Sequence, residues 1–443
     1  MGRPWDDGSE HQLIQDALAQ VERADSLGIQ YVWEVEHHFL EEYSHSSAPE
    51  VFLAACSQRT KSMRLGHGII LTAPQFNHQA RTAERVSMLD LVSSGRVEFG
   101  SGESSSEAEL GGFGLNPADK RDAWLEGLDV ALRCMVESPF TGVDGRFVTM
   151  PPRNVIPKPV QKPHPPLWVA CSRRETILLA AEKGMGALTF AFIDPEEAVN
   201  WVSEYERTFT ESCVPVGFAV NPQVACVSPM MVHHDEDEAI RRGAEGSNFF
   251  GYSLGHFYVF GDHRPGTTDV WSEYVDRRAA KGYDPAAVAA ARQRGVLGAK
   301  QAGGDTAGLR GSVGTPDQVR EYLRRFEQAG VDQVIFVLQA GRNEHDHIME
   351  SIEIFGTEIL PEFLERDEAQ VAAKARRLAP AIEAAMARKA AAYQQADIGD
   401  YSFPALPKQW ATATANAELA ASLEQWADDR ATGQRNPGAG IAG

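Results

Sequence analysis

One pattern constrains the fold of this chain more than any other: short β-branched, apolar runs alternate with longer helix-period segments from about residue 10 to residue 360. Such alternation is typical of βα units around a parallel sheet. The runs that have strand character are residues 31–36, 64–71, 96–101, 167–171, 187–192, 224–232 and 333–338. We therefore predict an α/β fold, a (β/α)8 TIM barrel, although an open doubly wound sheet would give a similar pattern.

The segments between these runs carry helix start signals. Pro49, Asp194-Pro195 and Thr315-Pro316 combine a possible cap with a proline that fits the first helical turn. The chain itself opens with a helical segment, residues 10–27, where a βα barrel should open with a strand. We therefore expect the first strand to be absent from this chain. Either Met1 is an internal methionine of a longer gene, which we favour, or the barrel is built without that strand and has an unpaired edge.

Two segments stand outside the repeat of the predicted barrel, which spans residues 1–362. Residues 235–313 form a long insertion after the seventh strand position of the barrel and are rich in aromatic side chains. Insertions of this length inside a compact domain are usually functional lids or spacers. The aromatic residues of the insertion are Phe249, Phe250, Tyr252, Phe257, Tyr258 and Phe260. Residues 363–443 read as a C-terminal helical extension that ends in a mobile tail from residue 409 onward.

Composition excludes several classes of function. The formal net charge of −20 repels phosphate backbones and anionic lipid, so we expect no nucleic-acid partner. The longest apolar runs are far shorter than the roughly 20 residues that cross a bilayer, so we expect no membrane protein. Five widely spaced cysteines fit neither a disulfide framework nor a zinc site, which indicates a reduced, cytoplasmic setting.

The catalytic groups of a βα barrel lie at the carboxyl ends of its strands. The first predicted strand ends in Glu36-His37-His38, which places Glu36 and His37 at the mouth. An imidazole beside a carboxylate suits general acid and base chemistry near neutral pH. A structural histidine bound to a backbone carbonyl is the alternative, and we favour that structural role for His38.

Glycine marks two further strand ends. Gly68 lies inside the predicted strand 64–71, where glycine indicates either tight packing or the close approach of a flat ligand to the backbone. Gly102 belongs to a loop rich in glycine and serine. Glu103 in that loop would repel an anion, and no nucleotide-binding glycine motif is present, so we predict a cofactor-side loop and not a phosphate cradle.

The best candidate for anion binding is the turn from strand 167–171 into the next helix. Helix N-termini attract phosphate, and the arginines here add fork-shaped donors. The residues that could contribute are Ser172, Arg173, Arg174 and Thr176. A surface salt bridge with Glu175 is the alternative.

No metal site is expected. His345 and His347 flank Asp346 after the last strand, but short His/Asp runs in loops are mostly solvated and no metalloprotease motif supports them.

Several pieces together resemble the bacterial luciferase-like flavin monooxygenases, over about residues 10–365. Their order and spacing carry the resemblance, since no single piece is specific. The matching pieces are Glu36-His37-His38-Phe39, Arg64-Leu65-Gly66, residues 89–96, Gly314-Thr315-Pro316 and Gly330-Val331-Asp332. The resemblance implies a (β/α)8 barrel that uses reduced FMN from a separate flavin reductase, O2, and a small organic substrate of alkanal or related type. It also implies a homodimer.

The resemblance assigns roles to individual positions. His37 is similar to the family's catalytic histidine and Glu36 to its neighbour at the flavin, while Gly68 and Ile69 resemble a strand bulge, often with a non-prolyl cis peptide, that supports the flavin ring. Arg173 and Thr176 resemble phosphate contacts.

The chain departs from the family pattern at one place in the cofactor loop. Gly102 and Glu103 stand where bacterial luciferase has a cysteine and a phosphate-binding arginine. Arg173 or Arg174 must therefore supply the phosphate contact.

Three rival functions remain open. A deazaflavin coenzyme could transfer hydride on the same barrel without oxygen, as in a branch of the same superfamily. A barrel metallohydrolase could use His37, His38 and a carboxylate on zinc, although no HxH ligand pair at the first strand supports it. A non-catalytic flavin-binding or scaffold protein would account for Glu103 and the absent strand.

Overall fold

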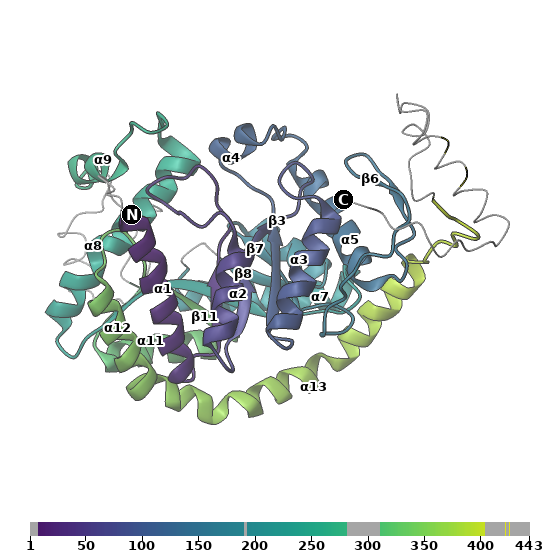
Figure 1. Ribbon diagram of the computed structural model, residues 1–443. Coiled ribbons are helices and arrows are strands. Elements are labelled where there is room, and N and C mark those ends of the chain that lie inside the picture. Colours follow the sequence, from purple (N-terminus) through teal and green to yellow (C-terminus); the bar gives the residue numbers. More distant parts are fainter. Residues whose placement is uncertain (1–7, 190–192, 281–310, 404–420, 422–424, 426–443) are drawn as a thin grey trace. The chain divides into compact units, whose positions relative to one another are not determined.

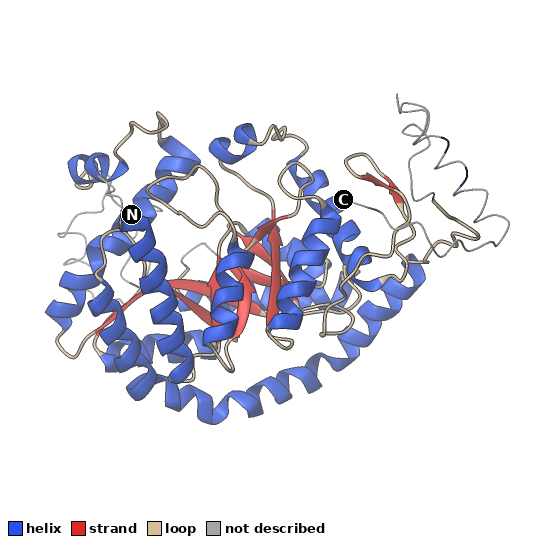
Figure 2. Cartoon of the chain, in the orientation of Figure 1, coloured by secondary structure: helices blue, strands red, loops and turns tan. Residues whose placement is uncertain are grey.

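A mostly parallel sheet curves into a nearly closed barrel, with helices packed around its outside (Figures 1 and 2). The computed structural model describes residues 8–189, 193–280 and 311–403, together with residues 421 and 425. The chain divides into two compact units, Met1–Gln395 and Ala396–Gly443. The barrel and all the elements named below belong to the first unit.

The strands follow one another around the wall in the order β1 (Tyr31–Glu34), β2 (Arg64–His67), β4 (Val97–Gly102), β7 (Leu167–Cys171), β8 (Gly186–Thr189), β9 (Val224–Val232) and β10 (Ser312–Gly314). β3 (Ile70–Leu71) continues the line of β2 along β4, and β11 (Gln333–Val337) pairs with β9. All of these pairings are parallel. The predicted barrel architecture is therefore confirmed.

β1 lies at one end of the wall, and β10 and β11 lie at the other, where both pair with β9. β1 pairs with β2, β11 pairs with β9, and no strand within the described ranges joins the other edge of either. The expectation that a first strand is absent concerns sequence outside this chain and stays a prediction.

The helices lie between the strands in chain order. They are α1 (Ser9–Ser26), α2 (Pro49–Arg59), α3 (Gln79–Val92), α4 (Glu107–Gly112), α5 (Lys120–Val136), α6 (Arg174–Glu182), α7 (Pro195–Ser212), α8 (Glu236–Gly255), α9 (Val270–Arg277), α11 (Pro316–Gln328), α12 (His345–Ile354) and α13 (Leu360–Ala392). Two π-helical turns, η1 (His256–Phe260) and η2 (Phe355–Ile359), continue α8 and α12. The predicted starts at Pro49, Pro195 and Pro316 are confirmed, the last with a capping box between Thr315 and Gln318.

The strand boundaries differ from the predicted ones in places. The predicted strand 64–71 is split into β2 and β3 by the Gly68–Ile69 peptide, which is cis. β10 and a short antiparallel hairpin of β5 (Val143–Asp144) and β6 (Thr149–Met150) were not predicted, because two- and three-residue strands are too short to show a period of two. Residues 190–192 of the predicted fifth strand and most of the predicted mobile tail lie outside the described residues.

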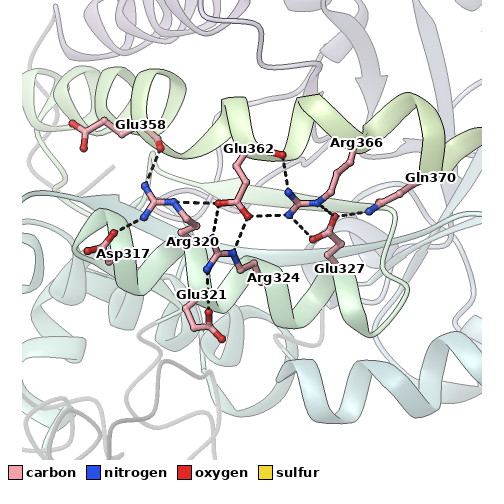
Figure 3. Close-up of polar contacts among 9 residues, drawn as sticks. All are labelled: Asp317, Arg320, Glu321, Arg324, Glu327, Glu358, Glu362, Arg366 and Gln370. Atoms are coloured by element: carbon pink, nitrogen blue, oxygen red, sulfur yellow. Dashed lines mark hydrogen bonds and ion pairs between the residues drawn. The ribbon is translucent and has the colours of Figure 1, made fainter.

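α13 runs along the outside of the barrel below the strands (Figure 1). A network of ion pairs joins its first turns to α11, and Glu362 lies at the centre (Figure 3). The Glu362 carboxylate is 2.8 Å from Nε of Arg324, 3.1 Å from Nη2 of Arg366 and 3.4 Å from Nε of Arg320. The hydrogen bond from Arg324 is the main reason that the pKa of Glu362 is lowered.

Candidate functional site

One cavity of about 1470 Å³ opens at the carboxyl ends of the strands and extends between β1 and β11. Among the residues predicted from sequence, it is lined by Glu36, His37, Gly68, Ile69, Ser172, Arg173 and Thr176. The structure thus brings the imidazole of His37 and the guanidinium of Arg173 to a single cavity.

His37 lies in the loop that follows β1, and its ring is held by Glu109 of α4. Nδ1 of His37 is 3.1 Å from Oε1 of Glu109. The same carboxylate accepts hydrogen bonds from the backbone N–H of His38, at 3.1 Å, and from the Ser104 hydroxyl, at 2.6 Å. Burial alone would raise the pKa of Glu109, but these hydrogen bonds, first that from His37, lower it overall. An ionised carboxylate only accepts, so Nδ1 carries the proton of this contact.

The sequence interpretation missed Glu109. A local signal for it exists, because Ser106 caps α4 by accepting from the backbone N–H of Glu109. Serine followed three residues later by glutamate is a typical helix start. That spacing places Glu109 at the first turn of a helix that follows a strand end, where side chains can reach the mouth.

The carboxylate of Glu36 holds the segment after β3 and the side chain of His38. Its oxygens accept from the backbone N–H of Leu71, at 2.8 Å, and from the side-chain amide of Asn77, at 2.9 Å, and one oxygen lies 3.1 Å from Nε2 of His38. The carboxylate therefore fixes the connection after β3 and pairs with His38, while His37 pairs with Glu109.

Two glycines of the β2–β3 segment differ in what surrounds them. A Cβ on Gly66 would lie 2.3 Å from the ring of Trp33, so Gly66 is required by packing. A Cβ on Gly68 would be 3.5 Å from its nearest neighbour, which is ordinary contact, and Gly68 lines the cavity. Gly102 lies behind Ile69, with its Cβ position 3.0 Å from Cδ1 of Ile69, and is not among the lining residues.

A further part of the cavity lining, here called the cationic end, carries basic side chains. Arg173 reaches it from the start of α6, and Lys120 and Arg121 reach it from the start of α5. Burial is the main cause that lowers the pKa of Lys120, and the nearby Arg173 charge lowers it further. Glu103 does not dominate this end, because it pairs with Arg121 at 2.8 Å and lies 4.0 Å from Lys120.

The hydroxyls of Ser105, Ser172 and Thr176 complete this end. Arg174 takes no part in it: its guanidinium forms a double contact with Glu204 of α7, and it does not line the cavity. Of the two adjacent arginines, only Arg173 is placed to meet an anion. Lys120 and Arg121 were missed because they follow a loop of another βα unit.

Glu34 is a further cavity-lining residue that the sequence interpretation missed. It ends β1, and burial raises its pKa to about 7, although a hydrogen bond from Ser46 partly opposes the shift. Carboxyl groups with such shifts are concentrated at functional sites.

Within the predicted insertion, the structure describes α8, η1 and α9, which we call the cover because Phe250, Leu254 and Tyr258 line the cavity. Two consecutive carboxylates of the His37 loop hold this cover. Glu41 accepts from the backbone N–H of Gly266 at 2.7 Å. The buried Glu42 accepts from the N–H groups of Val270 at 2.6 Å and Trp271 at 3.1 Å, at the start of α9. The loop that carries His37 and the cover are therefore one connected structure.

A metal site does not emerge from the residues that the structure describes: they contain no group of three or more His, Cys, Asp or Glu side chains able to hold an ion. His37 and His38 bind different carboxylates, and Nδ1 of His345 lies 3.0 Å from the Gln20 amide. None of the described helices combines the length and apolar character that a membrane-spanning segment requires.

Comparison with known proteins identifies the family to which this chain belongs. A sequence model of the luciferase-like monooxygenases matches residues 1–333. The oxygenase component of a flavin-dependent trigonelline monooxygenase from Acinetobacter baylyi is 25% identical over 375 residues, which is 82% of this chain and 94% of that protein. A protein from Sinorhizobium fredii is 32% identical over 196 residues, or 44% of this chain, and the chain spans about half of its length, 54%.

Solved structures share the barrel. The crystal structure of monooxygenase RslO1 from Streptomyces bottropensis matches with a TM-score of 0.62 and 25% identity, covering 80% of this chain and 95% of that one. A coenzyme F420 dependent tetrahydromethanopterin reductase from Methanopyrus kandleri matches with a TM-score of 0.56 and 20% identity, covering 79% and 96%. The second match concerns the fold alone.

Proposed function

Because this chain belongs to the luciferase-like monooxygenase family, we propose that it is a flavin-dependent monooxygenase that uses reduced FMN and O2 on a small organic substrate. One observation carries the proposal: His37 and the cationic end formed by Lys120, Arg121 and Arg173 line the same cavity. The flavin-dependent relative from Acinetobacter baylyi, matched over 94% of its length, supports this reaction class.

The residues of the cavity fit an FMN molecule. Lys120 and Arg173, with the hydroxyls of Ser172 and Thr176, would hold the phosphate, and the N–H groups at the start of α6 favour an anion there. Gly68 leaves space where a side chain would otherwise project, which suits a flat ring. Reduced FMN would supply the electrons that activate O2.

His37 and Glu109 would manage the proton of the reaction. The carboxylate of Glu109 fixes Nδ1 of His37 as a donor, so Nε2 is the ring atom that can accept or deliver a proton. The cover of α8 and η1, with Phe250, Leu254 and Tyr258 in the cavity wall, would exclude water from this exchange.

We further propose that a separate reductase supplies the reduced flavin and that the protein acts as a homodimer. The relative from Acinetobacter baylyi is described as an oxygenase component, which supports the reductase.

The test is a flavin titration followed by oxygen consumption with reduced FMN and candidate substrates. His37→Ala should retain flavin binding, since the cationic end is untouched, and should lower product per O2 consumed at least tenfold. Unchanged coupling of oxygen to product in this variant would remove His37 from the proposed role.

A deazaflavin-dependent hydride transfer is the second candidate, because the structure shares its fold with an F420 dependent reductase. The two candidates differ in their need for oxygen. Product formed from reduced deazaflavin under strictly anaerobic conditions, with none from reduced FMN plus O2, would establish the second candidate and refute the first.

A further inference from the structure

The end of the cavity next to His37 is built from aromatic rings. Tyr43, six residues after His37, places its ring centroid 5.2 Å from the His37 ring in an edge arrangement. The Phe250 ring stacks on Tyr43 at 5.4 Å, and the Tyr258 ring lies 6.3 Å away edge-on. All three rings belong to the cavity lining. The aromatic wall therefore begins directly at the proposed catalytic imidazole.

α8 and η1 contribute side chains to this aromatic wall from one face of the helix only. Phe250, Leu254 and Tyr258 are spaced four residues apart along α8 and η1, so they follow one side of the helix into the cavity. The fully buried Phe249 and Tyr252 point elsewhere and pack on Trp271 and Tyr274 of α9. Phe249 and Tyr252 thus belong to the protein core, whereas Phe250, Leu254 and Tyr258 line the cavity.

Two phenol groups add hydrogen-bond donors to this otherwise apolar wall. Among the described residues, the hydroxyls of Tyr43 and Tyr258 have no hydrogen-bond partner, and both side chains are half-buried in the cavity wall. Burial, and then the charge of Glu109, raise the pKa of the Tyr43 hydroxyl; burial likewise raises that of Tyr258. Both hydroxyls therefore stay protonated and can donate. A ligand with an acceptor at this place would receive hydrogen bonds that the described residues do not make with these hydroxyls.

We propose that the aromatic end of the cavity binds a flat, uncharged aryl carbonyl compound, with its ring against Tyr43 and Phe250 and its carbonyl oxygen accepting from the hydroxyls of Tyr43 and Tyr258. This substrate class rests on the proposed function, because it places the carbonyl group beside His37. Stacked and edge-on ring contacts favour a planar ring over a flexible chain, and the phenol donors favour a ketone or aldehyde over a hydrocarbon.

The experiment measures binding without turnover, so that it does not depend on the flavin reaction. Acetophenone and ethylbenzene share a ring and a two-carbon side chain, and only the first has an oxygen. Decanal carries a carbonyl, as an aldehyde, on a flexible chain without a ring. The affinity of the full-length protein for each compound is measured by ligand-observed NMR, and FMN affinity is measured in parallel.

We expect acetophenone to bind at least fivefold more tightly than ethylbenzene or decanal. Tyr43→Phe and Tyr258→Phe keep the rings and remove only the hydroxyls, so each should weaken acetophenone binding about three- to tenfold and leave ethylbenzene unchanged. Phe250→Ala should weaken both ring compounds. Tyr252→Phe is the matched control on the core face of the same helix and should change nothing.

Equal affinities for acetophenone and ethylbenzene, tighter binding of decanal, or hydroxyl variants that bind like the parent protein would each overturn the substrate class. Any of these results combined with normal FMN affinity would leave the proposed monooxygenase intact. If the parent protein does not bind FMN but binds the aryl ketone, the proposed function is refuted and the aryl carbonyl site is retained.

Discussion

Nδ1 of His37 lies 3.1 Å from Oε1 of Glu109, and this contact ties the loop after β1 to the helix that follows β4. The two segments belong to different βα units and meet only because the strand ends converge on one mouth. The carboxylate sets which ring nitrogen carries a proton, and so determines which one faces the chemistry.

Glu109→Gln should lower kcat about 10- to 100-fold, since an amide holds the ring without the negative charge that stabilises a protonated imidazole. FMN affinity should stay unchanged, because the residues proposed to hold the phosphate are untouched. Glu107→Gln, on the exposed side of α4, is the control. A Glu109→Gln enzyme with the parent kcat would remove the contact from catalysis.

Gly68→Ala and Gly66→Ala should separate ligand space from packing. The new methyl at position 68 meets nothing closer than 3.5 Å, so the fold should persist while FMN affinity falls at least tenfold. At position 66 the methyl would lie 2.3 Å from the Trp33 ring, and overpacking of this kind costs about 1–3 kcal/mol of stability. Thermal melting and flavin titration distinguish the two effects. The assignment of Gly68 to ligand space and Gly66 to packing is contradicted if Gly68→Ala is the less stable variant or if Gly66→Ala is the one that binds FMN more weakly.

Lys120→Met and Arg173→Met should each weaken FMN binding about 10- to 100-fold, because each removes a charge-assisted contact to the phosphate. Riboflavin lacks the phosphate and should bind these variants almost as well as it binds the parent protein. Arg174→Met provides the neighbouring control, since that side chain pairs with Glu204 outside the cavity. Fluorescence quenching with both flavins is the measurement, and equal losses for the two flavins would argue against a phosphate site.

Glu34 should make stability depend on pH in a defined window. Its folded-state pKa of about 7 lies above the ordinary value of 4.5, so its contribution is fully present below pH 4.5 and is lost as the pH rises through 7. Relative to Glu34→Gln, the parent protein should lose roughly 2–3 kcal/mol across this interval. Urea unfolding at several pH values measures the difference, with Glu22→Gln on the exposed side of α1 as control. If the difference in unfolding free energy between the parent protein and Glu34→Gln does not vary with pH, the raised pKa of Glu34 is refuted.

Glu42→Gln should loosen the cover without unfolding the barrel. The amide cannot accept from both Val270 and Trp271, so backbone hydrogen exchange in α9 and in the His37 loop should quicken together. The fraction of O2 that ends in product should fall, with more released as hydrogen peroxide. Glu41→Gln, at the more exposed contact with Gly266, should act in the same direction and less strongly. Faster exchange in only one of the two segments would show that they are not coupled.

The sequence predicted the positions that depend on the barrel rule and missed those that depend on packing between units. His37 and Arg173 follow strand ends, so strand periodicity was enough to select them. Glu109 and Lys120 reach the same cavity from helices of other units, and no periodicity reports which helix side chains turn inward.

The sequence pattern also could not show which of two adjacent arginines faces the cavity. Arg173 directly precedes α6 and lines the cavity, while Arg174 begins the helix and pairs with Glu204. The side-chain direction changes from one residue to the next at a helix start, and sequence alone does not give the register.

The two faces of α8 have a consequence for how this protein can diversify. Phe249 and Tyr252 anchor the helix to α9, while Phe250, Leu254 and Tyr258 meet whatever enters the cavity. Descendants of this chain can therefore exchange three side chains on the inner face, and with them the molecules they accept, while the anchor on the outer face keeps the helix in place.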